Sequence, residues 1–124
     1  MEENHPANYK RLQEFIAELS GSLPGTMRAF TGLHKQATAD GALDHKTKEL
    51  IALGVALSIN CGGCVSYHVK QSLEVGASRE EILEAVGVAV MMGGGPAVVY
   101  GCEALAALDQ FLAESNLGTG ASAP

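Results

Sequence analysis

Four residues have the types and spacing that thiol chemistry needs: Glu49, Cys61, Cys64 and His68. The two cysteines are separated by two residues at the predicted start of a helix, an arrangement typical of a disulfide that forms and breaks readily. The N-terminus of a helix favours the thiolate over the thiol, and the thiolate is the reactive form of cysteine. Cys61 and Cys64 are therefore a candidate redox pair.

His68 and Glu49 add a candidate path for protons. His68 follows Cys64 by four residues, so both side chains leave the same face of one helix. A neutral imidazole can take the thiol proton, and an imidazolium can hold the thiolate. Glu49 lies at the polar end of an apolar helical stripe, and an antiparallel hairpin about Asn60 would bring it to within roughly one turn of His68. The sequence thus predicts a Glu49–His68–Cys64 series of proton contacts.

The elements that must position these residues are helices, because helical periodicity runs through almost the whole chain. No segment alternates as a strand between turns does. Pro24 suits a first turn, Asp44 an N-cap, and Ser78 to Glu81 a capping box, while Gly41 suits a left-handed helix end. We predict an all-α, single-domain bundle of about six helices, over residues 6–20, 24–41, 45–59, from Cys64 to about 76, 82–92 and 97–114. The predicted division is an N-terminal helix over 1–20, a helical domain over 21–115 and a flexible tail over 116–124.

Several helices carry more apolar surface than one small bundle needs. The third is apolar on all sides from Leu50 to Ile59 except at Ser58, so we expect it to be central and buried. The fifth is nearly as apolar, and together they predict a homo-oligomer. We expect buried stripes on the first, fourth and sixth helices, formed by Tyr9, Leu12, Phe15, Ile16 and Leu19, by Val65, Val69 and Leu73, and by Val98, Cys102, Leu105, Leu108 and Leu112.

Composition excludes several classes of protein. The 124 residues are 47% hydrophobic, which argues against disorder, and three cysteines are too few for a disulfide scaffold. The 8 Lys and Arg are scattered and outnumbered by 14 Asp and Glu, so no nucleic-acid partner is expected. The chain has no apolar run of about 18 residues that could span a membrane, and its acidic start is unlike a signal peptide. We therefore expect a cytoplasmic protein with no membrane association.

The spacing Glu49-x11-Cys61-Gly62-Gly63-Cys64-x3-His68 resembles the signature of the alkylhydroperoxidase D-like branch of the carboxymuconolactone decarboxylase superfamily. Residues 48–53 and 76–82 are similar to that branch as well, and the resemblance covers about residues 25–112. It implies an all-α fold, assembly into trimers or hexamers, and thiol-dependent reduction of a peroxide substrate. We expect an external dithiol as the reductant and no cofactor. Alkylhydroperoxidase D has a histidine directly before its second cysteine, where this chain has Gly63.

The resemblance also implies a role for each of the four residues. Cys64 resembles the cysteine that attacks the peroxide, and Cys61 the partner that resolves the product into a disulfide. His68 and Glu49 resemble the proton relay. The chain is shorter than alkylhydroperoxidase D, which suggests a single helical unit that finds its second half in another subunit.

Other interpretations of the same residues stay open. The cysteines could be buried structural thiols, or Cys61, Cys64 and His68 could bind zinc with Cys102, His45 or a carboxylate as fourth ligand. A decarboxylase-type lyase acting on a lactone acid, or a non-enzymatic metal-binding or redox-sensing oligomer, are the alternative functions. A thioredoxin is disfavoured because no strand precedes the cysteine pair.

The remaining candidate residues have simpler interpretations. His5, His34 and His45 have no evident partner in the sequence, so we expect them to be solvent-exposed. Cys102 lies on the predicted apolar stripe of the sixth helix and is expected in the core. Gly93-Gly94-Gly95-Pro96 lacks the spacing and the lysine of a phosphate loop, so it is interpreted as a helix break.

Overall fold

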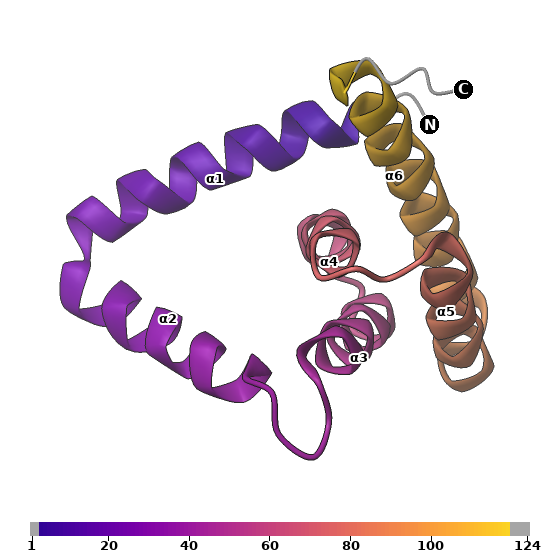
Figure 1. Cartoon of the computed structure of the whole chain (residues 1–124), viewed down its shortest axis with the longest axis horizontal. Coiled ribbons are helices and arrows are strands. Elements are labelled where there is room, and N and C mark those ends of the chain that lie inside the picture. The colour runs from indigo at the N-terminus through magenta and orange to yellow at the C-terminus, as the bar shows by residue number, and fades with distance from the viewer. Residues whose placement is uncertain (1–2, 120–124) are drawn as a thin grey trace.

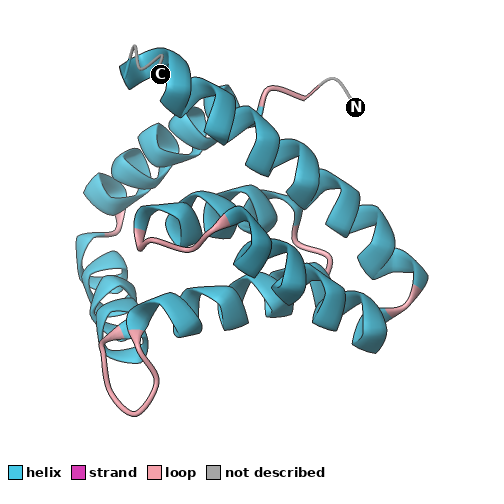
Figure 2. Cartoon of the chain, turned by 45° about the vertical axis from the view of Figure 1, so that its right-hand side comes forward, coloured by secondary structure: helices cyan, strands magenta, loops and turns pink. Residues whose placement is uncertain are grey.

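The computed structural model describes residues 3–119, and over that range it consists of six helices joined by short loops (Figures 1 and 2). This confirms the predicted all-α fold, and the described part of the chain holds no strand. It also holds no helix long and apolar enough to cross a membrane. The helices are α1 (His5–Ser22), α2 (Pro24–Thr38), α3 (His45–Ser58), α4 (Gly62–Glu74), α5 (Arg79–Gly93) and α6 (Gly95–Thr119).

Helices α3 to α6 form the packed body of the molecule, and α1 and α2 form an arm beside it. The most extensive contacts join α3 to α4 and α5, and join α6 to α4 and α5. The first turns of α1 lie against α6, the rest of α1 leads away from the body, and α2 returns toward α3 (Figure 1). The arm and α4 line opposite sides of a cavity.

Local sequence signals explain most helix boundaries. The Asp44 carboxylate accepts a hydrogen bond from the Thr47 amide, and the predicted capping box opens α5 with Ser78 and Glu81 each bonded to the other's backbone N–H. Asn60 turns the chain between α3 and α4 with φ of 59°, a left-handed conformation that asparagine tolerates. The prediction for Gly41 is wrong: α2 ends at Thr38, and in the described chain only Asn60, Gly76 and Gly94 have positive φ.

The core lies between α3, α4, α5 and α6. Its largest fully buried apolar side chains are Leu53, Leu57, Val65, Val69, Ile82 and Leu108. Val65 and Val69 confirm the predicted stripe of α4, since that helix is amphipathic and periodicity selects one face.

The predicted stripe of α6 is correct at Leu108, which is buried, and at Leu112, which is partly buried against the core, but wrong at its other three positions. The buried face of α6 carries three alanines together with Leu108 and Phe111, whereas Cys102, Val98 and Leu105 are exposed. Because α6 is apolar on several faces, periodicity could not identify the face that packs. The helix also continues to Thr119, beyond its predicted end at 114 and into the tail predicted over 116–124, whose residues 120–124 lie outside the described residues.

Much apolar surface stays exposed on this chain. On α3 only one face is buried, because Ile51 and Val55 are 50% and 51% exposed, so the expectation of a fully buried third helix is wrong. On α1, Phe15, Ile16 and Leu19 are exposed rather than packed in the core.

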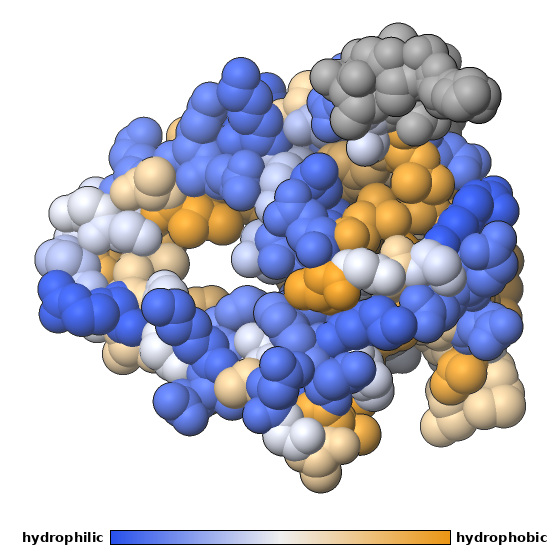
Figure 3. Space-filling model, viewed as in Figure 1, coloured by the Kyte–Doolittle hydropathy of each residue, from blue (hydrophilic) through white to orange (hydrophobic). Residues whose placement is uncertain are grey.

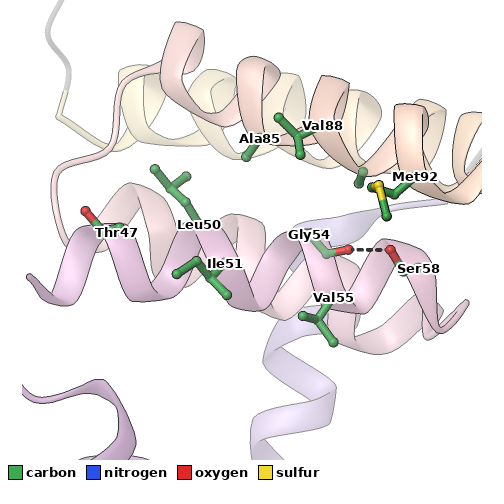
Figure 4. A pocket seen from close by; sticks show the side chains of 10 residues that line it. Thr47, Leu50, Ile51, Gly54, Val55, Ser58, Ala85, Val88 and Met92 are labelled. Carbon is green, nitrogen blue, oxygen red and sulfur yellow. Dashed lines mark hydrogen bonds between the residues drawn. The ribbon is translucent and has the colours of Figure 1, made fainter. Parts of the chain in front are cut away.

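The outer faces of α3 and α5 form an apolar groove of about 430 Å³, into which Leu50 and Met92 project (Figure 4). Val55, Val88 and Ala89 line the same groove. Its apolar lining is the surface that a partner would cover.

Candidate redox site

Cys61 and Cys64 form a disulfide at the first turn of α4, with their Cα atoms 5.1 Å apart. Cys61 is the N-cap residue of α4 in an extended conformation, and its carbonyl oxygen accepts the first helical hydrogen bond from Val65. The sulfur atoms therefore lie at the positive end of the helix dipole, where a thiolate is favoured. Gly63 between them has open space, since a Cβ there would meet no heavy atom within 4 Å.

Glu49, on α3, joins two histidines. Its side chain is fully buried, and Oε1 lies 3.1 Å from Nδ1 of His68 on α4. Its other oxygen, Oε2, lies 3.3 Å from Nε2 of His45, one turn earlier on α3. The predicted contact between Glu49 and His68 is thus present, across the α3–α4 hairpin.

The surroundings of Glu49 decide its charge. Burial raises the pKa of the Glu49 carboxyl, but the hydrogen bond and positive charge of His68, the hydrogen bond of His45 and the charge of His34 outweigh burial. The pKa is therefore held below its ordinary value, and the carboxyl is an ionised acceptor at neutral pH.

Both cysteines open onto a cavity of about 540 Å³ between the α1–α2 arm and α4. Apolar side chains from the arm make one wall, and Cys61, Cys64, Tyr67 and His68 make the other. In the space-filling view the molecule is hollowed between the arm and the body, with apolar side chains along the rim (Figure 3). The residues from the arm are Leu12, Ile16, Met27, Phe30, Thr31 and His34.

Tyr67, His34 and Thr31 are polar side chains of this cavity that sequence analysis did not place at the site. Tyr67 is half-buried, and burial, followed by the negative charge of Glu49, raises the pKa of its hydroxyl. The Nε2 atom of His34 is buried with no hydrogen-bond partner among the described residues. No local signal marks His34, because α2 reaches the site only through the tertiary fold, whereas Tyr67 directly precedes His68 on α4.

The expectation that His5, His34 and His45 are exposed and unpartnered is wrong for His5, and wrong in part for the other two. His5 is buried, with Nδ1 2.6 Å from the Ser66 hydroxyl, and it ties the start of α1 to α4. His34 and His45 are partly buried, and His45 is a partner of Glu49. The spacing of His45 and Glu49, four residues apart on one helix, is a signal that the sequence contained.

The structure also bears on the predicted contact between His68 and Cys64, on Cys102 and on the zinc alternative. Cys61, Cys64 and His68 line one cavity, but the described hydrogen bonds include none between His68 and Cys64. Cys102 is an exposed free cysteine, which corrects its expected place in the core. In residues 3–119 no three His, Cys, Asp or Glu side chains are grouped as a metal site requires.

Known proteins share this sequence and fold. A sequence model described as the carboxymuconolactone decarboxylase family matches residues 24–107. An uncharacterised protein of Cupriavidus necator is 42% identical over 91 residues, which are 73% of this chain and 80% of that protein. An uncharacterised protein of the cox locus in Paracoccus denitrificans is 46% identical over 82 residues, 66% of this chain and 74% of that one.

Solved structures agree. A carboxymuconolactone decarboxylase family protein from Legionella pneumophila superposes with a TM-score of 0.83 at 42% identity, covering 86% of this chain and 96% of that one. A protein from Thermotoga maritima is described as possibly involved in the antioxidative response. It gives a TM-score of 0.68 at 31% identity, and the match covers 73% of this chain and 94% of that one. The matched family region contains Glu49, both cysteines of the Cys61–Cys64 disulfide and His68. By sequence and by fold, the chain belongs to the carboxymuconolactone decarboxylase family.

Proposed function

We propose that this protein is a thiol-dependent peroxidase that cycles through the Cys61–Cys64 disulfide, with His68 and Glu49 as its proton relay. The observation that carries the proposal is the combination of a disulfide at a helix N-terminus with a histidine of the same cavity wall, whose Nδ1 is bonded to a buried carboxylate. A structural disulfide does not need such a histidine and carboxylate beside it.

The first step is attack on the peroxide by Cys64. Its thiolate attacks the outer oxygen of the peroxide: an S–O bond forms, the O–O bond breaks, the other oxygen leaves as an alkoxide, and Cys64 becomes a sulfenic acid. The leaving alkoxide takes the proton that His68 received from the Cys64 thiol, so it departs as an alcohol. His68 lines the cavity with Cys64, and its Nε2 is the ring nitrogen left for this transfer because Nδ1 faces Glu49.

The second step is resolution by Cys61. Its sulfur attacks the sulfenic acid, the S–S bond forms, and the hydroxyl leaves as water with the proton of the Cys61 thiol. An external dithiol then reduces the disulfide by exchange and is itself oxidised to a disulfide. The net reaction converts a peroxide and a dithiol into an alcohol, water and a disulfide.

The cavity also favours one kind of peroxide. Its walls are mostly apolar, with Leu12, Ile16 and Phe30 on the side of the arm. A volume of about 540 Å³ is far more than hydrogen peroxide occupies. We expect organic hydroperoxides with an apolar group to react faster than hydrogen peroxide.

The test follows peroxide loss and protein thiols in wild type, Cys64→Ser and Cys61→Ser, after complete reduction. We expect Cys64→Ser to lose the activity, and Cys61→Ser to react once and stop as a sulfenic acid, because it lacks the resolving thiol. Mass spectrometry of wild type after one equivalent of peroxide should show a loss of two hydrogens in the peptide that carries both cysteines.

The exposed Cys102 offers a matched control. Cys102→Ser removes a thiol far from the cavity in sequence and should keep wild-type turnover. Unchanged turnover in Cys64→Ser would exclude the role assigned to Cys64. Activity on a lactone acid that survives loss of both cysteines would instead support the decarboxylase-type alternative.

A further inference from the structure

His45 is a polar contact of the site that the proposed peroxide cycle does not use. It is the first residue of α3, its side chain is 40% exposed, and its Nε2 reaches Oε2 of the fully buried Glu49 at 3.3 Å. The backbone holds it there, because its amide donates to Asp40 Oδ1 at 2.7 Å and the N-cap Asp44 fixes the first turn. The contact is therefore placed by a well-anchored helix start.

The two oxygens of Glu49 have separate partners. Oε1 faces His68 Nδ1 and Oε2 faces His45 Nε2, so each oxygen has one histidine nitrogen within hydrogen-bond distance. An ionised carboxylate can only accept, so each facing nitrogen must carry a proton. For a neutral His68 this fixes the tautomer: the proton is on Nδ1, and Nε2 has the lone pair.

Removing His45, the donor to Oε2, would change the protonation of Glu49 and with it the tautomer of His68. A buried carboxylate with an unpaired oxygen is costly, and it takes up a proton more readily. A protonated Glu49 can donate to His68 Nδ1, which moves the ring proton to Nε2 and removes the base from the cavity side. A histidine base held in the wrong tautomer is strongly impaired in catalysis.

We propose that His45 is a positioning residue of the Cys61/Cys64 site, which keeps Glu49 an acceptor and thereby holds His68 with its proton on Nδ1. The role deepens the proposed peroxidase function, since it explains how His68 stays available to Cys64. The other titratable groups around the pair are His34 from α2 and Tyr67 from α4, with Asp40 beside His45. None of these donates to Oε2 among the described hydrogen bonds, so His45 has no substitute there.

The test uses reduced protein and needs no peroxide. Ring nitrogen shifts of His68, measured by NMR, report its tautomer, and alkylation of Cys64 by iodoacetamide in the Cys61→Ser, Cys102→Ser background reports its thiolate. We expect His45→Leu to redistribute the His68 proton toward Nε2 and to slow alkylation near pH 6.5 by about tenfold. His45→Gln, whose amide nitrogen can replace Nε2 as donor, should restore both readouts.

Two further variants make the outcome decisive. Lys46→Leu changes the neighbouring residue of the same turn, which pairs with Glu81 and not with Glu49, and should leave both readouts as in wild type. If His45→Leu fails to fold by circular dichroism, His45→Asn replaces it, because its shorter amide does not reach Oε2. Wild-type nitrogen shifts and alkylation rates in a folded Leu or Asn variant would overturn the proposal. Failure of wild type to consume peroxide would defeat the peroxidase function alone and leave this result standing.

Discussion

At the scale of single residues, Glu49 governs the candidate site. It is a fully buried acid bonded to His68 and His45, and its pKa is held below the ordinary value although burial raises it. A group whose pKa is lower in the folded than in the unfolded chain stabilises the fold above its unfolded pKa. That stabilisation is lost as the pH falls through the folded pKa.

This leads to a prediction for Glu49→Gln, which keeps the shape and removes the charge. The variant should lower the free energy of unfolding at pH 7 by about 1–3 kcal/mol, because one histidine nitrogen loses a charged acceptor. The difference from wild type should shrink as the pH falls below the ordinary glutamate value of 4.5. Urea unfolding from pH 7 to pH 3 measures it.

Glu74→Gln is the matched control for that experiment. Glu74 is an exposed glutamate that pairs with Lys70 at 3.6 Å on the surface of α4, so its loss should cost less than about 1 kcal/mol. A Glu49→Gln variant as stable as Glu74→Gln at pH 7 would contradict a charged, doubly bonded Glu49.

At the scale of elements, side-chain caps fix the starts of α3 and α5. Ser78 and Glu81 satisfy each other's backbone N–H groups at the start of α5. The start of α3, which carries His45 and Glu49, has a one-way cap, in which the Asp44 carboxylate accepts from the Thr47 amide. These caps therefore fix where two core helices begin, and one of them aligns the site.

Ser78→Ala should lower the free energy of unfolding by about 1 kcal/mol, because two backbone donors at the start of α5 lose their arrangement. Thermal or urea unfolding measures the change. Ser22→Ala is the control, since the Ser22 hydroxyl bonds only to the Glu18 carbonyl inside α1, and its loss should stay within about 0.5 kcal/mol. Equal effects of the two substitutions would argue against the cap.

At the scale of the whole molecule, exposed apolar surface is the main feature. The groove between α3 and α5 is lined by Leu50, Val55, Val88 and Met92, and the large apolar side chains of α1 and α2 are exposed as well. Contiguous apolar patches of this kind mark interfaces in folded proteins. We therefore keep the prediction that the chain assembles with copies of itself as a trimer or hexamer.

Val55→Glu tests this prediction, because it places a charge in the groove at a side chain that is half exposed in the single chain. We expect wild type to sediment as an oligomer at micromolar concentration and Val55→Glu to shift to smaller species, since burying an unpaired carboxylate at an interface is costly. Gln36→Glu, which adds the same charge on an exposed position of α2, should assemble as wild type does. A wild-type protein that sediments as a monomer would refute the prediction.

The sequence by itself determined the helices and identified the residues of the candidate site. Periodicity and caps are local properties, so all six helices, the Asp44 cap and the Ser78 capping box could be predicted. The contact between Glu49 and His68 could also be predicted, because a tight turn between two helices fixes which residues face each other. The spacing of the cysteines placed them within reach of a disulfide.

Only the tertiary structure decided what surrounds the residues of the candidate site. Helix α6 is apolar on several faces, so its sequence could not show that the side opposite Cys102 packs inward. His34 and the apolar cavity wall come from an arm whose position depends on long-range packing, and His5 finds its partner Ser66 61 residues away. Local signals act over a few residues of one helix, whereas a cavity and its charges arise from segments that meet only when the chain is folded.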